Sequence, residues 1–262
     1  MPTDAAPDCP GWAPPLLALQ FLTRLPAPAT ARLTPAQVRI GLARAVGWFP
    51  LVGMLIGIVT ASVVLLADQL WPRPVAVLLG LIVEARLTGA FHEDAVADFC
   101  DGLGGGHNAE ATLLILRDSR IGSYGALGLL LAVGLRAALM LALPAPLLWI
   151  VIVAAATFGR LLVVAAMALI PPIPARVGLS RDIAATVGPR RLLFAALLAT
   201  PALLALALQA PLVPIAALVA AGPFLLWFRR LLLTRIGGST GDCLGFSAYA
   251  GQLLLLLAAT AG

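Results

Sequence analysis

Long apolar runs constrain this chain more than any other feature of its sequence. Seven runs are present, at roughly 46–67, 74–91, 123–143, 147–170, 192–209, 211–228 and 243–261. A helix needs about 20 apolar residues to cross the hydrocarbon core of a bilayer. Only 11% of the residues are charged, whereas a soluble domain of this length carries about 25%. The sequence therefore predicts an all-α, polytopic membrane helix bundle with about seven transmembrane helices, built as a single domain over residues 1–262.

A shorter apolar stretch precedes the first run. It extends from Trp12 to Leu22 and is stopped by Pro26 and Pro28. This length is too small to span a bilayer, so we expect residues 12–24 to form an interfacial segment. The first residues lack a basic segment followed by an apolar core, and a cleaved signal peptide is therefore not expected.

Arginines lie mainly in alternate connections between the apolar runs. These connections, together with the residues before the first run, carry Arg24, Arg32, Arg39, Arg44, Arg117, Arg120, Arg176, Arg181, Arg190, Arg191, Arg229, Arg230 and Arg235. Because Lys and Arg favour cytoplasmic loops, we expect the N-terminus and the connections 92–122, 171–191 and 229–242 in the cytoplasm, and the C-terminus outside. No arginine-rich arm or basic helix face is present, so we expect membrane lipid and not nucleic acid as a partner.

Acidic residues gather in a first motif that follows the second apolar run. Asp94, Asp98 and Asp101 are spaced i, i+4 and i+7, which places them on one face of a helix. Three clustered carboxylates repel one another unless a cation or proton lies among them. Mg²⁺ is often held by one or two carboxylates together with substrate phosphates. The stripe favours a catalytic magnesium site, and the alternative is an acidic helix end solvated by the cytoplasm.

Two further polar residues precede this stripe. His92 suits three roles, those of a metal ligand, an acid or base in catalysis, and an ordinary interfacial residue. Glu93 points away from the stripe on a helical wheel, so we expect it to be solvated.

A second motif, Arg117-Asp118-Ser119-Arg120, lies just before the third apolar run. Guanidinium groups pair bidentately with phosphate oxygens, so this segment could clamp a substrate phosphate. The alternative is ordinary anchoring at the cytoplasmic side, with Asp118 paired to one of the arginines.

A third motif precedes the last apolar run and contains Gly237, Gly238, Thr240, Gly241 and Asp242. Glycines around a hydroxyl and a carboxylate suit a backbone cradle for an anion, with a metal-binding Asp242 at its edge. The same loop would also serve as the N-cap of the following helix.

Four charged residues fall within predicted spans, namely Glu84, Arg86, Arg136 and Arg160. An arginine at the centre of a spanning helix costs at least ~2.5 kcal/mol and normally faces the bundle interior. Arg160 is the best candidate of the four for binding substrate, and the others are expected to pair internally.

Taken in order, the three motifs resemble those of the cobalamin synthase family, the adenosylcobinamide-GDP ribazoletransferases. Residues 89–102 are similar to the family pattern G-G-F-H-x-D-G-x-A-D-x-x-D-G, residues 116–125 to M-[RK]-D-S-R-x-G-x-x-G, and residues 237–246 to G-G-x-T-G-D-x-L-G-A. The stretches 21–26 and 49–53 also resemble family segments, and Arg160 falls where the family has a [ST]-R pair. The chain departs from the patterns at Ala95 (usually Gly), Phe246 (usually Ala) and Gln252 (usually Glu).

The resemblance implies a transferase in the last stage of nucleotide loop assembly in cobalamin biosynthesis. Such an enzyme joins α-ribazole, or its 5′-phosphate, to adenosylcobinamide-GDP, and forms adenosylcobalamin, or its 5′-phosphate, and GMP. It requires Mg²⁺ and works in a bacterial cell inner membrane, with the site facing the cytoplasm. Whether it forms a homo-oligomer stays open.

The resemblance also implies roles for the motif residues. Asp94, Asp98 and Asp101 would hold Mg²⁺, together with Asp242, and His92 or one of the carboxylates would deprotonate the attacking hydroxyl. The substrate-binding set would be Arg117, Asp118, Ser119, Arg120, Arg160, Gly237, Gly238, Thr240 and Gly241.

Two other classes of protein compete with this interpretation. CDP-alcohol phosphotransferases carry a pattern like D-G-x-x-A-R, but here Ala95 stands in place of its Gly and Asp98 in place of its Arg. A cation- or proton-coupled transporter would place its carboxylates near the middle of the membrane, whereas these acidic residues crowd toward one side.

Overall fold

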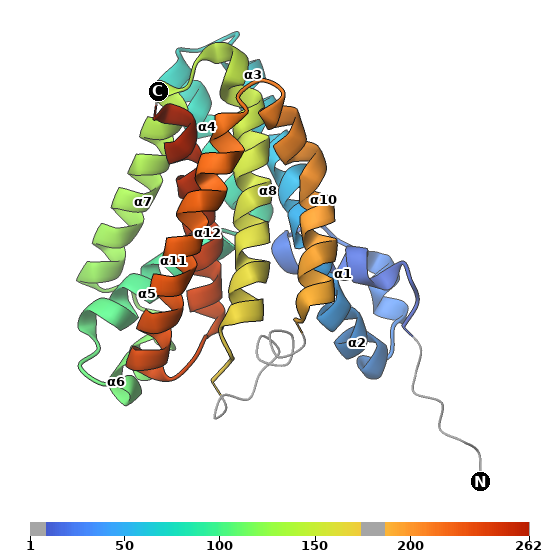
Figure 1. The fold of residues 1–262 in the computed structure, drawn as a ribbon, viewed down its shortest axis with the longest axis vertical. Helices are drawn as coiled ribbons and strands as arrows, with labels where there is room; N and C mark the ends of the chain where they lie inside the picture. Colours follow the sequence, from blue (N-terminus) through green and yellow to red (C-terminus); the bar gives the residue numbers. More distant parts are fainter. Residues whose placement is uncertain (1–8, 174–186, 262) are drawn as a thin grey trace.

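The computed structural model describes residues 9–173 and 187–261 (Figure 1). Its helices are α1 (Ala13–Leu22), α2 (Pro35–Ala45), α3 (Phe49–Ala67), α4 (Arg73–Thr88), α5 (Phe91–Gly105), α6 (Ala109–Ile115), α7 (Ser123–Ala142), α8 (Ala145–Leu169), α10 (Pro189–Ala207), α11 (Leu212–Ile236) and α12 (Gly241–Thr260), with 3-10 turns at Pro28–Arg32 and Val46–Trp48. Within the described ranges, β structure is limited to one isolated bridge between Pro172 and Ser239. The predicted all-α class is confirmed.

Six helical segments of the described chain are long and apolar enough to cross a membrane. They are Pro35–Ala67, Ser123–Ala142, Ala145–Leu169, Pro189–Ala207, Leu212–Ile236 and Gly241–Thr260. The remaining predicted span, 74–91, corresponds to α4, which reaches the required length only when α5 is counted with it. The polytopic bundle of about seven spans is therefore confirmed, with one span broken.

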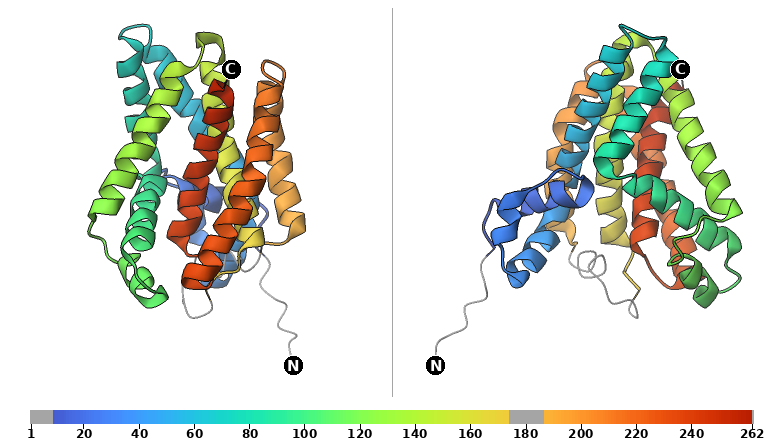
Figure 2. Two further views of the ribbon diagram at one scale, coloured as in Figure 1. Left: turned by 60° about the vertical axis from the view of Figure 1, so that its left-hand side comes forward. Right: turned by 180° about the vertical axis from the view of Figure 1, so that it is seen from behind.

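The break between α4 and α5 is a bend of 88°. Gly89 and Ala90 both adopt left-handed backbone conformations there, with φ of 73° and 57°. Glycine does so without strain, whereas the Cβ of an alanine raises the cost by roughly 1–2 kcal/mol. Figure 2 shows α5 turning away from α4 and running toward the start of α7. A strained hinge thus redirects the chain immediately before the first acidic motif.

Helix α8 lies at the centre of the bundle, between α3 and α12 (Figure 1). Small residues allow this close packing: a Cβ added at Gly57 of α3 would meet the Val153 backbone, and one at Gly251 of α12 would meet Gly159 of α8. Small residues at helix contacts are typical of membrane bundles, because association there depends on van der Waals packing. The α3–α8–α12 layer forms the rigid base of the site described below.

One ion pair is buried inside the bundle. Arg136 of α7 lies 2.7 Å from Glu84 of α4, and both side chains are at most 3% exposed. The Thr60 hydroxyl of α3 donates a second hydrogen bond to Glu84, at 2.8 Å, and the Arg136 guanidinium lies over the Tyr249 ring of α12. The expected internal pairing of Glu84 and Arg136 is confirmed, whereas Arg86 is exposed.

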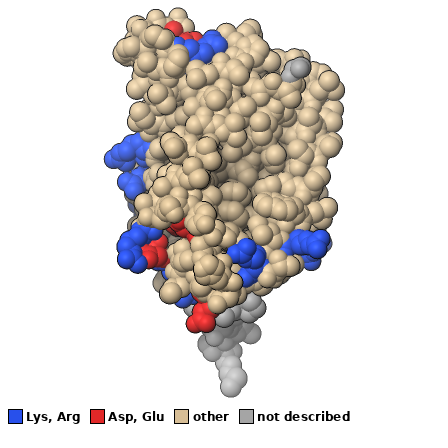
Figure 3. Space-filling model, turned by 90° about the vertical axis from the view of Figure 1, so that its left-hand side faces the viewer, with Lys and Arg blue, Asp and Glu red and all other residues tan. Residues whose placement is uncertain are grey.

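Charged side chains on the surface are unevenly distributed. On the face shown in Figure 3 they gather toward the lower half of the molecule, and much of the surface above is uncharged, with a small charged group at the opposite end. Of the connections expected in the cytoplasm, 92–122 contains α5 and α6, and 229–242 contains the end of α11. Residues 174–186 of the connection 171–191, including Arg176 and Arg181, lie outside the described residues.

We expect Arg136→Leu to lower the free energy of unfolding by about 3–5 kcal/mol, because the Glu84 carboxylate would stay buried without its partner. The double variant Glu84→Leu/Arg136→Leu should recover most of this loss, since neither charge remains. Thermal unfolding in detergent measures both. As a control, removing the partly exposed Asp68–Arg73 pair should cost less than about 1 kcal/mol. An Arg136→Leu variant as stable as the wild type would contradict this role of the pair.

Candidate active site

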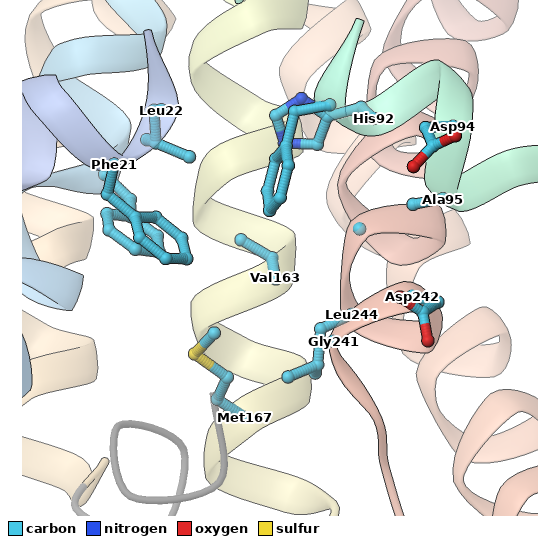
Figure 4. Close-up of a pocket in the computed structure, with 13 residues that line it drawn as sticks. Phe21, Leu22, His92, Asp94, Ala95, Val163, Met167, Gly241, Asp242 and Leu244 are labelled. Atoms are coloured by element: carbon cyan, nitrogen blue, oxygen red, sulfur yellow. The ribbon is translucent and has the colours of Figure 1, made fainter. Parts of the chain in front are cut away.

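A cavity of about 330 Å³ opens among α1, α3, α5, α8 and α12 (Figure 4). Most of its wall is apolar, and its polar groups are His92, Asp94 and Asp242. The full lining is Phe21, Leu22, Phe49, Phe91, His92, Asp94, Ala95, Val163, Met167, Gly241, Asp242, Leu244 and Gly245. Residues from the first and third sequence motifs thus share one cavity, although about 150 residues separate them in the chain.

Carboxylates gather along one side of this cavity. Asp94 lies in the first turn of α5 and Asp242 in the first turn of α12, and both side chains border the cavity in Figure 4. One helical turn after Asp94, the Asp98 carboxylate is repelled by those of Asp94, Asp242 and Asp101. The two helices approach closely, since a Cβ added at Gly245 would collide with that of Ala95.

The acidic side chains suit a hard divalent cation without forming a complete cage for one. Among residues 9–173 and 187–261, no three His, Cys, Asp or Glu side chains are close enough to form a metal site. Mg²⁺ is usually bound by only one or two carboxylates, with water and substrate phosphates completing its coordination. The oxygen donors of Asp94, Asp98 and Asp242, and the repulsion at Asp98, fit such a cation.

Asp101 behaves differently from the rest of the predicted stripe. Its carboxylate is buried and accepts hydrogen bonds from the backbone N–H groups of Gly122, at 2.7 Å, and Gly125, at 2.8 Å. Both donors lie at the start of α7, so Asp101 caps that helix and holds α5 against it. This use of both carboxylate oxygens favours a structural role for Asp101 over the metal-binding role expected from the sequence.

The second motif lies between α6 and α7, at the surface. Arg120 pairs bidentately with Asp118, with its Nη2 2.6 Å from Oδ2, and this pairing lowers the pKa of Asp118 to about 2. The expected pairing of Asp118 with a neighbouring arginine is therefore confirmed, whereas the phosphate clamp stays a prediction. Arg117 and Ser119 are exposed, and an open hollow of about 480 Å³ beside Arg120 extends to Asp101 and Tyr124.

The third motif closes α11 and starts α12. Gly237 ends α11 in a left-handed conformation, with φ of 78°. The Thr240 hydroxyl then accepts a hydrogen bond from the backbone N–H of Cys243, at 3.3 Å, so the expected N-cap is confirmed. Gly238 packs against the Pro171 carbonyl, where a Cβ would not fit. Within this motif, Gly241 and Asp242 reach the cavity.

Arg160 is fully buried on α8, beside a residue of the cavity wall. Its Nη2 is 3.4 Å from Nδ1 of His92, and its Nε has no hydrogen-bond partner within the described part of the chain. A guanidinium can only donate, so Nδ1 of His92 accepts and the neutral ring carries its hydrogen on Nε2. Arg160 therefore orients a cavity-lining histidine and does not line the cavity itself.

Glu93 is not the solvated neighbour that its helical position suggested. Its side chain is 17% exposed and one carboxylate oxygen lies 3.9 Å from Arg136. The expectation failed because the 88° bend turns this side of α5 toward the bundle interior, beside the Glu84–Arg136 pair. Glu93 and Arg136 thereby connect the first turn of α5 to the buried charges of the core.

Sequence reasoning assigned no role to the aromatic wall of the cavity. Phe21, Phe49 and Phe91 come from α1, α3 and α5 and meet through ring contacts with centroids 5.6–5.7 Å apart. The signal that could have found them was the likeness of the stretches 21–26 and 49–53 to family segments far from the acidic motifs.

Gln252 was noted only as a departure from the family pattern. Its side chain is buried, and its Oε1 lacks a hydrogen-bond partner within the described residues.

Fold and site together define a polytopic helical membrane protein with an acidic cluster along an apolar cavity. The chain belongs to the cobalamin-5-phosphate synthase family, whose model matches residues 14–260. The resemblance of the three motifs is therefore confirmed. Family membership favours the transferase over the CDP-alcohol phosphotransferase and the transporter.

Similar proteins support this assignment. A protein of Leptothrix cholodnii is 40% identical, over 94% of this chain and 92% of its own. One of Bradyrhizobium diazoefficiens is 39% identical over the same shares, and one of Ralstonia nicotianae is 37% identical over 92% of both chains. Each is named an adenosylcobinamide-GDP ribazoletransferase. No solved structure matches the chain.

We expect Asp101→Asn to lower the free energy of unfolding by about 1–3 kcal/mol, because one of the two α7 amides would lose its acceptor. Asp98→Asn should leave stability unchanged or raise it, since it removes repulsion from three carboxylates. Thermal unfolding in Mg²⁺-free detergent solution compares the two matched substitutions. If Asp98→Asn were the more destabilising, these two roles would be wrong.

Proposed function

We propose that this protein is an adenosylcobinamide-GDP ribazoletransferase that requires Mg²⁺. It would join α-ribazole, or its 5′-phosphate, to adenosylcobinamide-GDP and release GMP. The observation that carries the proposal is the meeting of Asp94 and Asp242, from two separate motifs, along one cavity, with Asp98 close enough to both to be repelled by them, in a chain of this family. Transfer between phosphates depends on positioning and charge neutralisation more than on covalent catalysis, and this site supplies both.

One or two of the carboxylates of Asp94, Asp98 and Asp242 would hold the cation, with water and substrate phosphates completing its coordination, and Asp101 would hold α5 in place. Bound Mg²⁺ would neutralise charge on the pyrophosphate of adenosylcobinamide-GDP. Arg117, Ser119 and Arg120 lie on the exposed side of the second motif, where a guanidinium can pair with phosphate oxygens. Arg120 would have to exchange Asp118 for the substrate to do so.

The reaction forms one P–O bond and breaks another. A ribose hydroxyl oxygen of α-ribazole attacks the phosphorus on the cobinamide side, the bond to the bridging oxygen breaks, and GMP leaves with that oxygen. The hydroxyl proton passes to a carboxylate of the acidic cluster. His92 is less suited to take it, because its Nδ1 already accepts from Arg160; its Nε2–H would instead donate to a substrate oxygen.

The active site would face the cytoplasm of a bacterial cell, in its inner membrane. This orientation is supported by the arginine-rich connections at Arg117–Arg120 and Arg229–Arg235, which adjoin the second and third motifs. The opposite connections contain few charges, such as Asp68 and Arg73. Nothing in this mechanism requires a second copy of the chain.

We expect the purified protein in nanodiscs to release GMP from adenosylcobinamide-GDP and α-ribazole only when Mg²⁺ is present. Asp98→Asn should lower kcat at least about a hundredfold, because a carboxylate that would help to hold the neutralising Mg²⁺ is lost. Chromatography of GMP and of the corrinoid product measures both. The matched control is Glu110→Gln, an exposed carboxylate on α6, which should keep full activity. A folded wild-type protein that turned over neither ribazole nor its phosphate would refute the proposal.

The orientation is tested separately with terminal fusions. Alkaline phosphatase fused after Gly262 should be active, because it folds only outside the cytoplasm, and the same enzyme fused before Met1 should be inactive. Green fluorescent protein at the two positions should give the reverse pattern. An active phosphatase at the N-terminus would place the motifs on the opposite side of the membrane.

A further inference from the structure

The cavity beside the acidic cluster has two chemically different walls (Figure 4). One is aromatic: Phe21 stacks on Phe49 with centroids 5.7 Å apart, and Phe91 meets Phe21 edge-on at 5.6 Å. The other side holds the carboxylates of Asp94 and Asp242. A ligand that fills the cavity must therefore present an apolar ring at one end and polar groups at the other.

Phe91 is 40% exposed although it lies at a helix start inside this wall. Phe49 and Leu22, by contrast, are at most 3% exposed. A ligand with a flat ring binds more tightly when its ring covers such an accessible aromatic side chain. The favoured arrangements are offset or edge-to-face, with ring centroids about 4.5–7 Å apart. The geometry therefore favours a planar aromatic group over a branched aliphatic one.

The size of the cavity and the charge of its wall decide which component of the proposed reaction can occupy it. Small-molecule pockets range over about 300–1,000 Å³, and this cavity of about 330 Å³ is at the small end, so it cannot enclose a corrin ring. No Arg or Lys lines it, whereas two aspartates do, so it is also a poor site for the guanine nucleotide with its phosphates. The remaining component is a flat, apolar bicyclic base carrying a ribose.

We propose that this cavity binds α-ribazole, with the benzimidazole-type base against Phe91, Phe21 and Met167 and the ribose hydroxyls toward Asp94 and Asp242. This inference rests on the proposed function and goes further by locating one substrate. The larger substrate then approaches from outside the cavity, with its pyrophosphate at the acidic cluster. The two reactants meet where the aromatic wall ends and the carboxylates begin, which brings the ribose hydroxyl next to the phosphorus it attacks.

The test compares two phenylalanines of similar exposure. Phe91→Ala removes a ring from the cavity, and Phe194→Ala removes one that is 38% exposed on α10 and contacts Trp48 instead. For Phe91→Ala we expect the KM for α-ribazole to rise about tenfold, because one good aromatic contact with the base is lost. The KM for adenosylcobinamide-GDP should not change. Phe194→Ala should leave both constants unchanged. Phe21→Ala, a second cavity variant, should repeat the effect.

A direct measurement of α-ribazole binding distinguishes a wrong binding site from a wrong proposed function. Equilibrium dialysis of α-ribazole against the protein in nanodiscs, without the second substrate, should show binding to the wild type and to Phe194→Ala, and about tenfold weaker binding to Phe91→Ala. If the proteins bound α-ribazole with this pattern but the wild type showed no turnover, the proposed transferase function would be refuted and the proposed α-ribazole site would stand. Turnover with an unchanged KM for α-ribazole in both cavity variants, or a rise only for adenosylcobinamide-GDP, would overturn the site and keep the transferase.

Discussion

The ion pair between Glu84 and Arg136 is the constraint on which the rest of the bundle depends. Both charges are removed from water, and each would be costly without the other. With Thr60 donating to Glu84 and the Tyr249 ring beneath Arg136, the pair connects four helices, α3, α4, α7 and α12. A sliding motion of α4 or α7 would leave a charge unpaired, and one of α3 or α12 would remove the hydroxyl or the ring that contacts the pair, so the pair restrains the positions of these helices along the bundle axis.

That fixed register decides where α5 can begin. Glu84 holds the last turns of α4, and five residues later the chain turns at Gly89 and Ala90. The bend carries Glu93 inward to Arg136 and leaves Asp94 on the cavity side. At the far end of α5, Asp101 anchors the helix to the amides that begin α7. The acidic residues are thus held at both ends of a short helix, which gives the site its rigidity.

Local patterns predicted much of this structure. Apolar length identified the spans, and i, i+4, i+7 spacing identified the acidic stripe, because both depend on residues close in the chain. The inward turn of Glu93 and the capping by Asp101 were not predictable in this way. They arise from the left-handed backbone at Ala90 and from contacts with α7, and neither the bend nor such distant contacts are encoded in a helical period. The meeting of Asp94 and Asp242 was anticipated only through the family resemblance.

The cavity also has a consequence for how the protein is made. Its walls combine Phe21, near the start of the chain, with Gly245, in the final helix. Membrane insertion proceeds from the N-terminus as synthesis advances, so the pocket is incomplete until α12 has entered the bilayer. A chain that terminates early can contain every acidic residue of α5 and still have no cavity. The cavity is therefore complete only when synthesis and insertion of α12 are complete.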